Sequence, residues 1–106
     1  MREAEYQNRL IHKISKYLPG ALVIKNDSSY IQGIPDLLIL FHDRWAMLEV
    51  KRSINESFEP NQQYYLDMLN GMSFAACIYP ENEGEVLDAL QQAFGIARQP
   101  RLFEPI

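Results

Sequence analysis

GIPDLLILFHDRWAMLEVK, from Gly33 to Lys51, is the segment that most constrains the structure of this chain. It contains two apolar runs, at 37–41 and 45–50, and apolar runs of this length between polar residues are typical of β-strands. The polar residues between them, His42-Asp43-Arg44, predict an antiparallel hairpin. The turn lacks a glycine, the residue that most readily supplies the positive φ of a tight hairpin turn.

The register of this hairpin brings charged residues together. With a turn centred on 42–43, the numbers of facing residues sum to 85, so Asp36 lies opposite Glu49. Side chains alternate along a strand, so Glu49 and Lys51 point to the same face. A slip of one residue would move Asp36 to the face of Val50 and would break up the apolar face of the hairpin. The pattern therefore predicts that two carboxylates and an amine converge.

The rest of the chain alternates between helical and strand-like patterns. Apolar residues recur every three or four positions through 3–18 and again after Pro60, which indicates amphipathic helices. The second of these helices lies between the third and fourth strands, so it can serve as a crossover that makes them parallel. The predicted elements are a helix over 3–18, a buried strand over 21–24, strands over 37–41 and 45–50, a helix from Pro60 to Gly71, a strand over 74–79, a helix closed by Gly95, and an extended tail over 97–106. This order, α-β-β-β-α-β-α, predicts a single α/β domain over 1–106 with helices on the faces of a mixed sheet.

Length and composition limit the class of protein. A chain of 106 residues forms one domain. Its net charge of -4 does not indicate a nucleic-acid binder, so a polyanion would have to bind to local basic residues. The single cysteine, Cys77, excludes an internal disulfide and indicates an intracellular, cytoplasmic protein. The N-terminus does not resemble a signal peptide. The longest apolar run, 37–41, is far shorter than the roughly 20 residues that span a bilayer, so no membrane partner is expected.

The converging residues indicate a particular chemistry. Two carboxylates held a few ångströms apart repel each other and are usually compensated by a cation. Hard carboxylate oxygens favour Mg²⁺, Mn²⁺ or Ca²⁺, and a neighbouring lysine can orient an attacking water or offset charge in a phosphoryl transition state. This combination suits phosphodiester hydrolysis. The alternative interpretation is that these residues form a solvated, alternating face at the strand ends.

A longer motif favours the first interpretation. Gly33-Ile34-Pro35-Asp36 is followed by Glu49-Val50-Lys51 and then by Pro60-Asn61-Gln62 at the start of a helix. From Glu3 to about Tyr79, this arrangement resembles the PD-(D/E)xK nuclease superfamily, and within it the small stand-alone VRR-NUC nucleases of phages and bacteria. The resemblance implies the α-β-β-β-α-β core of that superfamily, here followed by a C-terminal helix.

The resemblance also implies roles for individual residues. Asp36 and Glu49 would bind Mg²⁺, for which Mn²⁺ would substitute, and the backbone carbonyl of Val50 would join them. Lys51 would position the attacking water, and Gln62 would support the site from the second helix.

The first helix of the family usually supplies a glutamate, for which Glu3 and Glu5 compete. Helical phase favours Glu3 for this role, as a metal ligand, because Glu3 lies on the same side of the helix as Leu10 and Ile14, whereas Glu5 lies about 200° around the helix from Glu3. An exposed terminal acid is the alternative interpretation of Glu3.

Basic residues are candidates for contacts with the DNA backbone. Related sequences often have Lys or Arg shortly before the Gly-x-Pro-Asp motif, whereas this chain has Tyr30-Ile31-Gln32. Phosphate contacts would then come from elsewhere, although a solvated surface charge is the favoured interpretation of each basic residue taken alone. The candidates are Arg9, Lys13, Lys16, Lys25 and Arg52.

Together these features predict a Mg²⁺-dependent, structure-selective DNA endonuclease. Similarity to resolving enzymes implies that it acts on Holliday junctions or other branched or duplex DNA in recombination or repair, inside a bacterial or phage-infected cell. Two symmetric cuts require two sites, so a homodimer is expected, with Tyr64, Leu102, Phe103 and Ile106 as candidate interface residues. The alternatives are a flap or single-strand nuclease of the same family and a non-catalytic nucleic-acid-binding module on the same fold.

Overall fold

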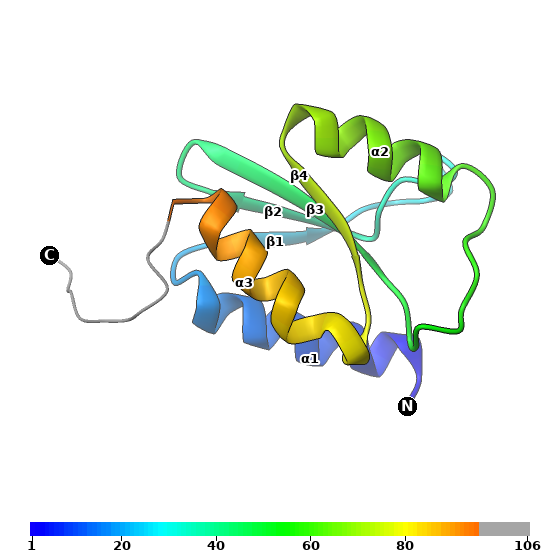
Figure 1. Ribbon diagram of the computed structural model, residues 1–106, viewed down its shortest axis with the longest axis horizontal. Helices are drawn as coiled ribbons and strands as arrows, with labels where there is room; N and C mark the ends of the chain where they lie inside the picture. The colour runs from blue at the N-terminus through cyan, green and yellow to red at the C-terminus, as the bar shows by residue number, and fades with distance from the viewer. Residues whose placement is uncertain (96–106) are drawn as a thin grey trace, which may run out of the picture.

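The computed structural model describes residues 1–95, and these form a four-stranded sheet covered by helices (Figure 1). The predicted order of elements is confirmed, with a short 3₁₀ helix added before the last α-helix. The predicted tail over 97–106 lies outside the described residues. The elements are α1 (Glu3–Tyr17), β1 (Leu22–Lys25), β2 (Leu37–Phe41), β3 (Arg44–Val50), α2 (Gln62–Met72), β4 (Phe74–Ile78), η1 (Pro80–Asn82) and α3 (Glu83–Ala93).

The strands lie in the order β1-β2-β3-β4, and only the β3–β4 pair is parallel. Helix α2 connects β3 to β4, so the predicted crossover is confirmed. In the hairpin, Leu37 pairs with Leu48 and Leu38 with Met47, which is the register that places Asp36 across from Glu49. His42 supplies the positive φ of the turn, at 58°, in place of a glycine.

The helices cover the two faces of the sheet unequally. Figure 1 shows α1 and α3 together on one face and α2 on the other. The larger core lies beneath α1 and α3, because the apolar stripe of α1 packs against the inward side chains of the central strands. Its fully buried members include Leu10, Ile14, Leu37, Ile39, Leu48 and Leu90. A smaller core lies beneath α2 and contains Leu66, Leu69 and Ala75.

The strand predicted over 21–24 is present as β1, but the prediction that it is buried is wrong. β1 is an edge strand, and its side chains Leu22 and Ile24 are 57% and 39% exposed. The reason is the position of α2, which packs mainly on β4 and leaves the β1 end of the sheet open on that face. An apolar run identifies a strand but not the layer that covers it.

The predicted boundaries of α2 also need correction. Pro60 lies before the helix, which begins at Gln62, because Asn61 adopts a left-handed conformation with φ 71°. Gly71 lies inside the last turn and does not end the helix, which is closed by a hydrogen bond from the N–H of Ser73 to the carbonyl of Leu69.

A close backbone contact joins the loop before β2 to the start of α2. Gly33 has a φ of 93°, and a Cβ at this position would lie 2.6 Å from the Cβ of Asn61 and 2.8 Å from its carbonyl carbon. Only glycine permits both this conformation and this contact. Gly33 and Asn61 therefore fix the distance between the segments that carry Asp36 and Gln62.

Within residues 1–95, no helix combines the length and the hydropathy that a membrane span requires.

Candidate functional site

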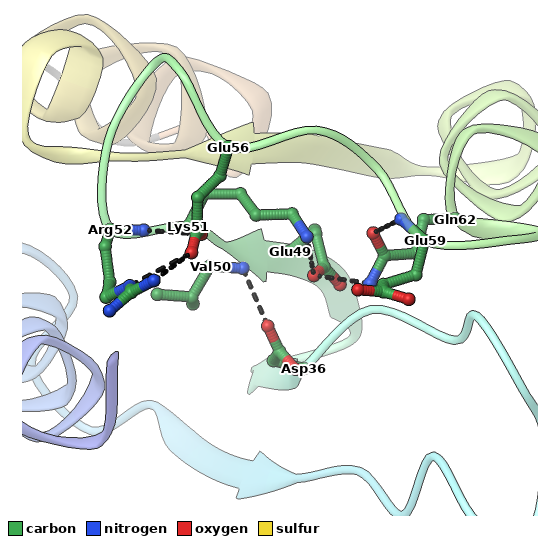
Figure 2. Close-up of polar contacts among 8 residues, drawn as sticks. All are labelled: Asp36, Glu49, Val50, Lys51, Arg52, Glu56, Glu59 and Gln62. Atoms are coloured by element: carbon green, nitrogen blue, oxygen red, sulfur yellow. Dashed lines mark hydrogen bonds and ion pairs between the residues drawn. The ribbon is translucent and has the colours of Figure 1, made fainter. Parts of the chain in front are cut away.

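The site forms at the open end of the β2–β3 hairpin (Figure 2). Asp36 comes directly before β2, and its Oδ2 accepts a hydrogen bond of 2.8 Å from the backbone N–H of Val50. This bond links the two strands beyond their last backbone pair, and it holds the Asp36 carboxylate beside the end of β3. The hairpin register, read from the sequence, thus determines which residues meet here.

Glu49 is the most deeply buried charged residue of the site, with 2% of its surface exposed. Its Oε2 accepts a hydrogen bond of 2.9 Å from Gln62 Nε2 and lies 3.6 Å from Lys51 Nζ. Its Oε1 is buried and has no hydrogen-bond partner among the described residues. A buried carboxylate oxygen without a partner carries a desolvation penalty, which a cation at this position would remove.

Lys51 is also buried, with 7% of its surface exposed. Its ammonium lies between the carboxylate of Glu49 and the ring of Phe58, whose centroid is 5.7 Å from Nζ. A carboxylate and an aromatic face both attract a cation, so together they hold the long side chain in one place. The sequence predicted Lys51 beside Glu49, but nothing in the pattern indicated Phe58.

Burial disfavours the ionisation of both central carboxylates, and the charge of Asp36 further disfavours that of Glu49. Burial raises the pKa of Glu49 to about 8, and the charge of Asp36 adds to this effect while Lys51 opposes it. Burial also raises the pKa of Asp36, although the N–H of Val50 favours its ionised form. Two carboxyl groups that resist ionising together are suited to sharing a proton or a metal cation.

Glu3 and Glu5 occupy different environments. Glu3 lines the same cavity as Asp36 and Glu49, and burial together with the charge of Asp36 raises its pKa. Glu5 instead accepts a hydrogen bond of 3.1 Å from the backbone N–H of Arg2 at the start of α1. This placement agrees with the helical phase of the sequence, while metal binding by Glu3 stays a prediction.

The cavity has a volume of about 460 Å³, and part of its wall is the loop between β3 and α2. The sequence pattern did not indicate these loop residues, because an irregular segment has no periodicity that would show which side chains turn inward. The available signal was the presence of two acids, Glu56 and Glu59, between the motif residues Lys51 and Gln62. The lining residues are Glu3, Asp36, Glu49, Lys51, Asn55, Glu56, Ser57, Glu59 and Gln62.

The predicted phosphate contacts are spread over the surface. Lys13 pairs with Glu83 on α3, and the Nζ of Lys25 donates a hydrogen bond to Asn8. These two residues, Arg9 and Lys16 do not line the acidic cavity. Arg52 follows Lys51 at the edge of the site, where it pairs with Glu56. DNA binding by all five basic residues stays a prediction.

The donors of the site fit a hydrated divalent cation. In residues 1–95, no group of three or more His, Cys, Asp or Glu side chains is placed to hold a metal ion together. Mg²⁺ does not require such a group, because it usually keeps several waters and binds one or two carboxylates. Asp36 and Glu49 supply two hard carboxylates, and the unpartnered Oε1 of Glu49 is an oxygen that such an ion would satisfy.

Comparison with solved structures identifies proteins of the same fold. A VRR_NUC domain matches with a TM-score of 0.63 at 21% identity over 85% of this chain and 94% of that chain. A VRR_NUC domain protein matches with a TM-score of 0.64 at 18% identity over 91% and 90%. Hjc, a Holliday junction resolvase from the archaeal hyperthermophile Archaeoglobus fulgidus, matches with a TM-score of 0.50 at 14% identity over 72% and 67%. The sequence matches no protein-family model and no curated protein.

These matches define the class of the fold. The chain has an α/β, VRR-NUC nuclease-like fold, which confirms the fold implied by the sequence resemblance.

Proposed function

We propose that this protein is a divalent-metal-dependent endonuclease that hydrolyses phosphodiester bonds in DNA. The proposal is carried by the buried Oε1 of Glu49, which has no hydrogen-bond partner in residues 1–95 and shares its cavity with Asp36 and Lys51. It is supported by the nuclease-like fold. A merely solvated charged face would not bury Glu49 and Lys51 together.

Asp36 and Glu49, with the backbone carbonyl of Val50, would hold Mg²⁺ or Mn²⁺. When bound, such an ion lowers the pKa of water and offsets negative charge on phosphate oxygens. Glu3 would contribute from α1.

The protein's own residues orient the reacting groups. Gln62 fixes the Glu49 carboxylate through a hydrogen bond of 2.9 Å, and the N–H of Val50 fixes that of Asp36. Lys51, held beside Glu49, uses its N–H groups to orient the attacking water or to stabilise charge that develops on the phosphate. Preorganised groups of this kind stabilise the transition state without reorganising during the reaction.

We further propose branched DNA as the substrate and a homodimer as the active form. Hjc is a Holliday junction resolvase, and this chain contains no motif that would read bases in a groove. Two symmetric cuts need two sites related by a twofold axis. Tyr64 is exposed on α2, where a partner could contact it, while Leu102, Phe103 and Ile106 lie outside the described residues. The proposed place of action is the cytoplasm.

The test is a cleavage panel of four-way, three-way, flap, linear duplex and single-stranded DNA, with Mg²⁺, with Mn²⁺ and with chelator. We expect metal-dependent cutting of branched DNA. Cleavage in chelator would contradict the metal-dependent mechanism. A preference for flaps or single strands would contradict the proposal that branched DNA is the substrate. No cleavage despite DNA binding would favour the non-catalytic module. Light scattering should give twice the chain mass of 12.3 kDa. A monomer that still resolves four-way junctions would contradict the proposed homodimer.

Variants separate the site from general charge effects. Glu49→Gln and Lys51→Ala should abolish cutting while DNA binding remains. Glu85→Gln, on the exposed surface of α3, makes the same charge change as Glu49→Gln and should leave cutting intact. An active Lys51→Ala enzyme would show that another group orients the water.

A further inference from the structure

The guanidinium of Arg52 is already occupied by a carboxylate. Glu56 Oε2 accepts a hydrogen bond of 3.0 Å from Arg52 Nε and lies 2.9 Å from Nη2 (Figure 2). Glu56 Oε1 accepts a further hydrogen bond of 3.0 Å from the backbone N–H of Arg52. These donors hold the pKa of Glu56 below its usual range. One carboxylate therefore uses three donors of a single residue at the edge of the cavity.

This set of donors also suits a phosphate. Two guanidinium N–H groups and a backbone N–H present the forked, charge-assisted geometry with which arginine binds both carboxylates and phosphates. Glu56, the partner of Arg52, lines the cavity, so the Arg52 donors lie at the cavity edge. A DNA phosphate that approaches Arg52 must therefore compete with Glu56.

Two hydrogen bonds of this turn do not involve the Glu56 carboxylate. The backbone N–H of Glu56 already donates to the carbonyl of Ser53 at 3.2 Å, and the N–H of Asn55 donates to Ser53 Oγ at the same distance. The ion pair of Arg52 and Glu56 is partly exposed, and exposed ion pairs contribute only about 0–1 kcal/mol to stability. Stabilisation of the loop is thus a weak explanation for a carboxylate aimed at Arg52 in a cavity that is already acidic.

We propose that Glu56 is a place-holder for a DNA backbone phosphate on Arg52. This inference rests on the proposed function. In the free protein, Glu56 satisfies Arg52. When DNA binds, a phosphate takes over the donors of Arg52 and Glu56 swings away, so Glu56 lowers the affinity for DNA in general. A DNA structure that positions a phosphate well at Arg52 overcomes this competition.

The experiment is a double-mutant cycle on DNA affinity. Binding of labelled four-way and linear DNA is measured by fluorescence anisotropy in Ca²⁺, and the DNA is checked for cleavage after each titration. Glu56→Gln keeps the size of the side chain and an acceptor for the N–H of Arg52 but loses the charge. It should tighten binding about fivefold, the order of one charge-assisted contact. Thermal denaturation confirms that each variant is folded.

Glu59→Gln is the matched control. Glu59 lines the same cavity, and no ion pair joins it to Arg52 in the described residues, so the same charge change there should alter affinity by less than about twofold. In an Arg52→Ala background, Glu56→Gln should no longer tighten binding. Equal gains from the two glutamine variants, or a gain that persists without Arg52, would overturn the inference while leaving the proposed function standing. If no variant binds DNA, both are overturned.

Discussion

Gly33→Ala tests how the loop before β2 is held against α2. Two costs add at this position. A residue with a side chain at a φ of 93° costs about 1–2 kcal/mol. The new methyl group would lie 2.6–3.0 Å from the Cβ, carbonyl carbon and carbonyl oxygen of Asn61, and overpacking of this kind costs about 1–3 kcal/mol. We expect a total loss of about 2–5 kcal/mol in the free energy of unfolding, measured by urea denaturation.

The chain provides matched controls for this substitution. Gly20 has a φ of 92°, but a Cβ added there would have no atom within 4 Å, so Gly20→Ala should show the backbone cost alone. Gly71 lies in α2 with open space around it, so Gly71→Ala should stabilise the protein by about 0.5–1 kcal/mol. If Gly33→Ala costs no more than Gly20→Ala, the contact with Asn61 does not constrain the fold, and the reasoning is wrong.

Three further predictions concern the carboxylates. At a Mg²⁺ concentration ten times the Kd, the wild type should gain about 1.4 kcal/mol of stability in thermal denaturation, and Glu49→Gln should gain much less; an equal gain would place the ion elsewhere. Without metal, stability should fall as pH rises from 4.5 towards about 8, by about 1 kcal/mol per pH unit, because Glu49 ionises readily only in the unfolded chain. In urea titrations at several pH values, Glu49→Gln should reduce the pH dependence of the free energy of unfolding. An unchanged pH dependence would show that other groups cause it. Asp36→Ala should be about 1–3 kcal/mol less stable than Asp36→Asn, because only asparagine retains an acceptor for the buried N–H of Val50, and equal stabilities would show that this hydrogen bond contributes nothing.

The parts of the site that follow from strand geometry could be predicted from the sequence. Alternation along β3 and a two-residue turn determine that Asp36 meets Glu49, and these depend only on counting residues. The phase of α1 likewise favoured Glu3 over Glu5. Each of these inferences depends only on the residue repeat of a strand or a helix, so it requires no knowledge of the remaining structure.

The parts that depend on packing between layers or on loop conformation could not be predicted. The exposure of Leu22 follows from where α2 lies on the sheet, which no local pattern encodes. The contact between Lys51 and Phe58, and that between Arg52 and Glu56, depend on the path of an irregular loop. The close approach of Gly33 to Asn61, a residue distant in the sequence, likewise follows from no local pattern.

The bond from Asp36 to Val50 has a consequence for the evolution of this chain. A descendant that had no use for the proposed catalysis could replace Glu49 and Lys51 together with apolar residues and lose only a costly buried ion pair. It would retain Asp36, because that carboxylate ties two strands together whether or not any chemistry takes place. In degenerate copies of such a gene, the aspartate is therefore a poor guide to activity, and the side chain at position 49 is the informative one.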